Sequence, residues 1–198
     1  MNATEGKQVV VIAGPTGSGE STITNEIVKM FPNRVARLVT ATTRPPRAGE
    51  KNGVDYYFLT PEEFSRYDAQ GSILEKTYIK NRKTYYGTYA SELEDKLKSG
   101  HIVVVNPDIV GARYYKKNFN AATIFIVPAN IDSIERRLRE RNPELSDAEI
   151  AKRCANAKAE IADEKSFYDH IVVNADGKLD EAVGEVVAIL KKEGYTLG

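Results

Sequence analysis

Apolar residues along the chain follow two alternating patterns, which predict a parallel sheet flanked by helices. Short apolar runs, typical of buried strands, lie at residues 8–13, 102–105, 123–127 and 170–173. Stretches with apolar residues at helical spacing lie at 21–30, 108–119, 131–141, 146–168 and 178–192. Two sequences of the form Ser/Thr-x-x-Glu, beginning at Thr60 and Ser146, are typical of a helix N-terminus. This alternation of strands and helices favours an α/β fold, with a parallel sheet between two layers of helices.

Two segments depart from this pattern and predict additions to the sheet. Residues 37–100 are rich in Tyr, Thr and Gly and have only short apolar runs, which indicates a small mixed sheet inserted into the α/β core. Residues 134–153 are dense in arginine and are interrupted by Asn142 and Pro143, a composition that suits a helical lid over phosphates as well as two solvated helices. We therefore expect a single domain over residues 1–198. Its core would comprise about 1–36, 101–133 and 154–198, its insert about 37–100, and its lid about 134–153.

Composition narrows the range of partners. The 198 residues are 41% hydrophobic and carry 28 basic and 28 acidic side chains, so net charge gives no reason to expect nucleic acid or a membrane as a partner. No apolar segment has the length of a transmembrane helix, and the first residues lack the apolar stretch of a signal peptide. Cys154 is the sole cysteine, which suits a reducing compartment, and we expect a cytoplasmic protein. Cys154, His101 and His170 are isolated in sequence, so we expect structural or surface roles for them.

A glycine-rich loop joins the first predicted strand to the first predicted helix. It consists of Gly14, Pro15, Thr16, Gly17, Ser18, Gly19, Glu20, Ser21 and Thr22. The pattern G-x-x-x-x-G-K-[ST] wraps backbone N–H groups around nucleotide phosphates, and its hydroxyl residue holds Mg²⁺. The loop therefore predicts an ATP-phosphate site, with Ser21 as the Mg²⁺ ligand. Glu20 stands where the pattern has lysine, so a carboxylate faces the predicted polyphosphate site.

Four further stretches together resemble the guanylate kinase family. They are TATTRPPRAGE at 40–50, NGVDYYF at 52–58, YYGT at 85–88 and DIVGAR at 108–113. The resemblance extends from the first strand to the last helix. It implies phosphoryl transfer from Mg²⁺-bound ATP to GMP, with GMP bound on the inserted sheet.

The resemblance also implies an acceptor site. Arg44 and Arg47 would clamp the GMP phosphate, because planar guanidinium groups match phosphate oxygens. Glu75 would recognise the base, since a carboxylate accepts from the ring N–H and exocyclic amine of guanine, whereas adenine has an acceptor nitrogen in place of that N–H. The other implied GMP contacts are Tyr56 and Tyr86 to the phosphate, and Thr40, Thr88 and Asp108 to the base.

On the donor side, the resemblance implies three catalytic arginines, but the sequence also differs from the family. Arg137, Arg141 and Arg153 would neutralise charge on the transferring phosphoryl group. The differences are Glu20 for lysine, Asn106 for the acidic residue nearest the metal, Val110 for a common glutamine, and Asn142 for a glycine.

Glu20 leaves the catalytic competence of the chain open. Two unit charges 4 Å apart interact by roughly 4 kcal/mol at an effective dielectric constant of 20, so a change from lysine to glutamate costs up to about twice that. Glu20 would relieve this cost by turning away, by pairing with a lid arginine, or by binding Mg²⁺. The sequence is thus compatible with an active guanylate kinase, with an impaired protein that still binds guanine nucleotides, and with a module that binds phosphorylated peptides.

Overall fold

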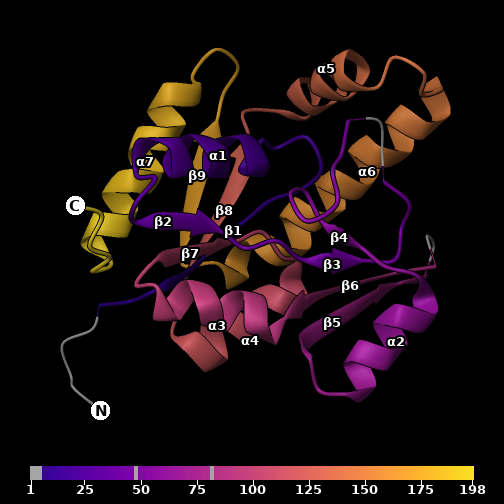
Figure 1. Ribbon diagram of the computed structural model, residues 1–198. Coiled ribbons are helices and arrows are strands. Elements are labelled where there is room, and N and C mark those ends of the chain that lie inside the picture. Colours follow the sequence, from indigo (N-terminus) through magenta and orange to yellow (C-terminus); the bar gives the residue numbers. More distant parts are fainter. Residues whose placement is uncertain (1–5, 47–48, 81–82) are drawn as a thin grey trace.

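A five-stranded parallel sheet forms the centre of the protein (Figure 1). The structure, a computed structural model, describes residues 6–46, 49–80 and 83–198. The strands are ordered β2-β7-β1-β8-β9, and every neighbouring pair is parallel. They are β1 (Val9–Ala13), β2 (Val35–Arg37), β7 (Ile102–Val105), β8 (Ala122–Pro128) and β9 (His170–Asn174). Because all the strands are parallel, their carboxyl ends lie at one edge of the sheet.

Helices cover both faces of this sheet, and the residue alternation of β1 shows why. Val10 and Ile12 pack in one apolar cluster with α1 (Glu20–Met30) and α7 (Leu179–Lys192). Val9 and Val11 point to the opposite face, where α3 (Ala90–Lys98) and α4 (Ile109–Phe119) contribute to a second cluster. A strand buried on both faces needs apolar residues at every position, which explains the continuous apolar runs in the sequence. The predicted α/β fold is confirmed.

A smaller mixed sheet lies beside the main sheet, as the composition of residues 37–100 predicts (Figure 1). Its order is β4-β3-β6-β5; β3 pairs in parallel with β4, and β6 pairs antiparallel with β3 and β5. The strands are β3 (Ala41–Thr42), β4 (Tyr57–Phe58), β5 (Ile73–Ile79) and β6 (Thr84–Tyr89). Helix α2 (Pro61–Ala69) begins at the predicted capping box of Thr60 and packs Phe64 against this sheet.

Two further helices, α5 (Ile131–Arg141) and α6 (Asp147–Glu164), occupy the arginine-rich region. They pack on each other through a separate apolar cluster that includes Ile134, Leu138 and Ile150. A capping box at Ser146 starts α6. The predicted helix 146–168 is shorter than expected, because a 3-10 turn at Lys165–Phe167 follows Glu164. Across residues 6–46, 49–80 and 83–198, no helix combines the length and the apolar character needed to cross a membrane.

Candidate active site

A cavity of about 600 Å³ lies where the glycine loop, the mixed sheet and the α5–α6 pair meet. The loop that follows β1 and the last residue of β2 line it, at the edge where parallel sheets usually bind ligands. Charged residues of both signs line it, among them the acidic Glu20 and the basic Arg37, Arg44, Arg141 and Arg153.

The glycine loop follows β1 directly and is held by close backbone contacts. Gly19 has φ 95°, and a Cβ atom there would lie 2.3 Å from Asn174 Nδ2, so only glycine fits. Asn174 Nδ2 donates to the Ser18 carbonyl at 2.7 Å. The first turn of α1 begins at Glu20, so the N-terminus of α1, which attracts anions, faces the cavity.

Glu20 folds back onto this loop. Ser18 Oγ donates to Glu20 Oε2 at 3.0 Å, and Ser21 Oγ donates to Glu20 Oε1 at 3.1 Å. Its carboxylate also lies in the first turn of α1, where the helix dipole stabilises negative charge. One expected way to relieve the charge of Glu20, an ion pair with a lid arginine, is not seen among the described residues. The hydroxyls of Ser18 and Ser21 bind the carboxylate instead.

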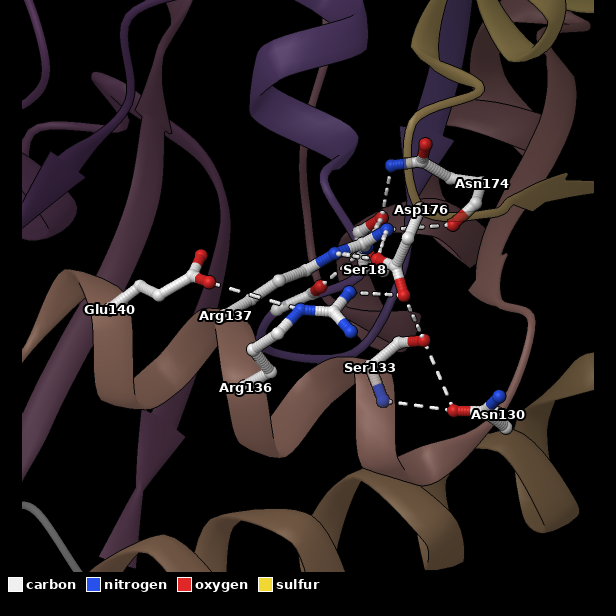
Figure 2. A network of polar contacts seen from close by, with 9 residues as sticks. Ser18, Asn130, Ser133, Arg136, Arg137, Glu140, Asn174 and Asp176 are labelled. Atoms are coloured by element: carbon white, nitrogen blue, oxygen red, sulfur yellow. Dashed lines mark hydrogen bonds and ion pairs between the residues drawn. The ribbon is translucent and has the colours of Figure 1, made fainter.

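Arg137 lines the cavity, but its donors bind within a polar network that joins α5 to the loop (Figure 2). Its Nη1 donates to the carbonyls of Gly17 and Ser18 at 3.0 and 3.1 Å, and its Nη2 donates to the Asn174 carbonyl at 2.9 Å. Nε and Nη2 bind Asp176. All three guanidinium nitrogens are therefore engaged by protein acceptors, which favours a positioning role over the implied contact with phosphate.

Asp176 is the acceptor at the centre of this network. Besides Arg137, it accepts from Ser133 Oγ at 2.7 Å and pairs with Arg136. The Arg136 guanidinium, with Ser133 and Arg137, lowers the pKa of Asp176 from 3.8 to about 2. Asp176 therefore stays ionised at neutral pH and holds α5 against the loop.

Arg44 presents its guanidinium at the junction of the large cavity and the mixed sheet. It forms two hydrogen bonds with Glu50, at 2.6 and 2.7 Å, and lies 4.9 Å from the centre of the Tyr56 ring. The Tyr86 ring packs edge-on against Tyr56, with ring centres 6.0 Å apart. Arg44, Tyr56 and Tyr86 thus meet as the sequence implies, whereas Arg47 lies outside the described residues.

A second, smaller cavity of about 120 Å³ adjoins this group on the mixed sheet. Its lining includes Thr40, Glu75, Tyr86, Asn106 and Asp108. Asp108 caps α4, because its Oδ1 accepts from the backbone N–H groups of residues 110 and 111, both at 3.0 Å. Of the residues implied for the base, Thr40, Glu75 and Asp108 therefore line one pocket, whereas Thr88 is fully buried and is not part of the lining.

Glu75 is the buried carboxylate of this pocket. Thr88 Oγ1 donates to Glu75 Oε1 at 2.8 Å, and Tyr115 Oη donates to Thr88 Oγ1 at 2.8 Å. Burial raises the pKa of Glu75 to about 7; the Thr88 hydrogen bond opposes the rise and the charge of Asp108 adds to it. Because an ionised carboxylate only accepts, the single Thr88 proton must point to Glu75, and Tyr115 must donate to Thr88.

Asn106 directly follows β7 and connects the two sides of the site. Its Nδ2 donates to the Ile12 carbonyl at 2.8 Å and to Thr24 Oγ1 at 3.0 Å. The Ile12 carbonyl accepts only, so the donation requires an amide where the family resemblance implies an acid. Asn106 therefore fixes the end of β1 against α1.

Three residues that the sequence did not single out take part in the site: Arg37, Tyr115 and Asp176. Arg37 has no clear sequence signal, because only two apolar residues precede it in its strand. Tyr115 belongs to the apolar pattern of its helix, and its buried hydroxyl has no sequence signature. Asp176 lies in the loop after β9, where its partners come from α5.

These features define a phosphotransferase of the phosphate-loop class, built to bind a nucleotide on a small mixed sheet. A family model described as guanylate kinase matches residues 6–193. The guanylate kinase of Synechocystis sp. (strain ATCC 27184 / PCC 6803 / Kazusa) is 37% identical over 187 residues, which cover 94% of each chain. That of Rickettsia bellii (strain RML369-C) is 36% identical over 186 residues, covering 93% of this chain and 94% of the relative. The crystal structure of guanylate kinase from Anaplasma phagocytophilum superposes with a TM-score of 0.73 at 26% identity, covering 96% of this chain and 88% of the other. The chain belongs to the guanylate kinase family.

Proposed function

We propose that the protein transfers the γ-phosphoryl group of ATP to GMP, giving ADP and GDP. The observation that carries this proposal is the buried Glu75 carboxylate beside the group formed by Arg44, Tyr56 and Tyr86. The pocket offers an acceptor for base N–H groups and, next to it, cationic and hydroxyl donors for one phosphate. A purine monophosphate with an N–H donor edge satisfies both.

On the acceptor side, base recognition depends on Glu75 being ionised. Its carboxylate would accept from the ring N–H and the exocyclic amine of guanine, whereas adenine would place a ring acceptor against it. An unpaired buried carboxylate is costly, so a base that leaves it unsatisfied is rejected strongly. Glu50 holds the Arg44 guanidinium in place, which reduces the entropy lost when a phosphate binds.

On the donor side, the glycine loop and the arginines of the lid would have different roles. The N–H groups at the start of α1 would bind the ATP phosphates, and Arg137 would hold the loop in position for them. Arg141 and Arg153 line the large cavity and form no ion pair among the described residues, so they would meet charge on the transferring phosphoryl group. The GMP phosphate would attack in line, with no covalent intermediate.

The oxygen donors in the loop fit Mg²⁺. Ser21 Oγ and the Glu20 carboxylate are neighbouring hard oxygens, while the described residues contain no group of three or more His, Cys, Asp or Glu side chains able to hold a metal. Mg²⁺ in kinases is bound largely through substrate phosphates and water, so such a sparse protein donor set is sufficient. Bound there through Ser21, it would neutralise charge on the donor phosphates.

Glu20 would weaken donor binding without removing the reaction. Its carboxylate is held by two hydroxyls of the loop and still lines the cavity, so it repels a polyphosphate. The described residues offer no observation that favours a phosphopeptide module or a binding protein without turnover. We infer an active kinase with a low affinity for ATP, working in the cytoplasm.

A coupled assay of ADP formation tests this function. We expect turnover with GMP and ATP, and little with AMP. Glu75→Gln should lower kcat/KM for GMP at least about 100-fold, because a buried hydrogen bond to a charge is lost. Glu92→Gln is the matched control, since the Glu92 carboxylate also accepts from a hydroxyl, that of Tyr57, but lies outside the pocket. Absence of both turnover and calorimetric GMP binding would contradict the proposal.

A further inference from the structure

Arg37 is the last residue of β2 and lies at the edge of the large cavity. It pairs in register with Val104 of β7, and two residues earlier Val35 packs in the cluster that includes α1. Side chains two residues apart on a strand point to the same face. Arg37 therefore points to the side of the sheet that α1 covers, at the end where α1 and the glycine loop begin.

The Arg37 guanidinium has no protein partner among the described residues. Its Nε is buried and forms no hydrogen bond, and no ion pair involves the side chain. Two other arginines of the cavity are already paired, Arg44 with Glu50 and Arg137 with Asp176. Buried donors are almost always satisfied in native proteins, so an unsatisfied one on a side chain that lines a polar cavity indicates an absent acceptor.

Arg37 lines the same cavity as Tyr56 and acts on the charge of its hydroxyl. Burial raises the pKa of the Tyr56 hydroxyl, Tyr86 and Glu20 raise it further, and Arg44 and Arg37 oppose the rise. Arg37 and Glu20 therefore both act on the same hydroxyl, from within one cavity. Arg37 therefore adds a cation to the cavity that the glycine loop and the residues implied for the GMP phosphate share.

We propose that Arg37 is a phosphate-binding residue that supplies, from β2, the positive charge that Glu20 does not provide in the glycine loop. This inference rests on the proposed kinase function, because it takes the nucleotide phosphates as the absent acceptor. A guanidinium suits the role, since its planar donors bind phosphate oxygens in pairs and it stays charged at any working pH. It restores one of the two unit charges that separate glutamate from lysine.

The first test compares Arg37→Met with Arg34→Met. Arg34 precedes the same strand, but it donates to the Thr196 carbonyl and lies outside the large cavity. We expect Arg37→Met to lower kcat/KM roughly 10- to 100-fold, the range for a lost hydrogen bond to a charged group, and Arg34→Met to change it less than about threefold. Arg37→Lys should recover part of the loss. Equal effects of Arg37→Met and Arg34→Met would overturn the inference.

Calorimetric titrations separate the phosphates from the base and from turnover. Arg37→Met should weaken GMP, ATP or both, whereas guanosine, which has no phosphate, should bind as it does to the unsubstituted protein. The GMP and ATP titrations show which phosphate Arg37 contacts. If the unsubstituted protein binds nucleotides without turnover, the proposed kinase function fails, yet these titrations still decide the role of Arg37. An equal loss for guanosine would indicate a folding defect and contradict phosphate binding.

A double substitution tests the link to Glu20. If Arg37 replaces the missing loop cation, Arg37→Met should lower kcat/KM less when Glu20→Lys is also present. The fold-change should then be less than about one third of the fold-change that Arg37→Met causes alone. The same fold-change with and without Glu20→Lys would show that the two positions act independently, and that Arg37 does not compensate for Glu20.

Discussion

Replacing Glu20 with lysine should raise ATP affinity and turnover while lowering stability. The Glu20 carboxylate accepts from the hydroxyls of Ser18 and Ser21 and lies in the first turn of α1. Glu20→Lys removes these two hydrogen bonds and places a cation at a helix N-terminus, which the helix dipole disfavours. The same cation would attract the donor phosphates that the carboxylate repels.

The magnitude follows from the charges. At about 4 Å and an effective dielectric constant of about 20, each unit charge contributes roughly 4 kcal/mol, so the reversal is worth up to about 8 kcal/mol. Solvent, Mg²⁺ and Arg37 screen the interaction. About half of that limit corresponds to roughly a thousandfold in kcat/KM for ATP. The lost hydrogen bonds and helix-end charge should lower the free energy of unfolding by about 1–3 kcal/mol.

The assay is a titration of ATP at saturating GMP, with urea denaturation of the same samples. Glu26→Lys is the matched control, since Glu26 lies on the same helix and pairs with Lys29 at the surface. Glu20→Gln should fall between glutamate and lysine. If Glu20→Lys lowers stability but leaves kcat/KM for ATP unchanged, the carboxylate does not limit donor binding and the electrostatic reasoning is refuted.

Four further predictions concern the base pocket and the lid. Because burial raises the pKa of Glu75 to about 7, GMP binding should strengthen about tenfold between pH 6 and pH 8 by calorimetry, and Glu75→Gln should remove this dependence. The same shift implies that the carboxylate costs stability as pH rises from 4.5 to about 7; Glu75→Gln should therefore raise the free energy of unfolding at pH 8 by up to about 3 kcal/mol, measured by urea denaturation. Tyr115→Phe should weaken GMP binding about three- to tenfold, whereas Tyr195→Phe, which removes another buried hydroxyl, should lower only stability in the same denaturation assay. Asp176→Asn should raise KM for ATP about tenfold by loosening Arg137 from the loop, while the exposed Asp132→Asn should leave KM unchanged.

The main sheet could be predicted from the sequence because burial on both faces leaves a continuous apolar run. The run at residues 8–13, for example, becomes β1, whose five residues are all buried. Strand β2 and helix α3 were not predicted. β2 has three residues with only Val35 fully buried, and in α3 the one fully buried residue is Leu93. Elements with so little apolar pattern depend on tertiary contacts that a sequence does not display.

The candidate site could be predicted as a set of residues but not as a set of contacts. Motifs identified Glu75, Arg44 and Asp108, and the structure brings Glu75 and Asp108 to one pocket, with Arg44 nearby. The partners of Arg137 are backbone carbonyls of a loop 120 residues away in sequence. Backbone acceptors are present at every residue, so no pattern of side chains marks the ones that Arg137 binds. The same holds for the hydroxyl of Tyr115, whose position follows from the packing of α4 on the mixed sheet.

Glu20 reverses the charge of the loop, but it does not reverse the charge of the cavity. Among the described residues that line the cavity, five are arginines and three are carboxylates, Glu20, Glu50 and Asp55, which leaves an excess of two positive charges. Arg37, Arg141 and Arg153 form no ion pair among the described residues, so Glu20 faces more cations than it can neutralise. The low-dielectric walls of a cleft strengthen the attraction between this excess positive charge and an incoming polyphosphate. A lysine at position 20 would double it to four, so the charge reversal should change how strongly the cavity binds phosphates rather than whether it binds them.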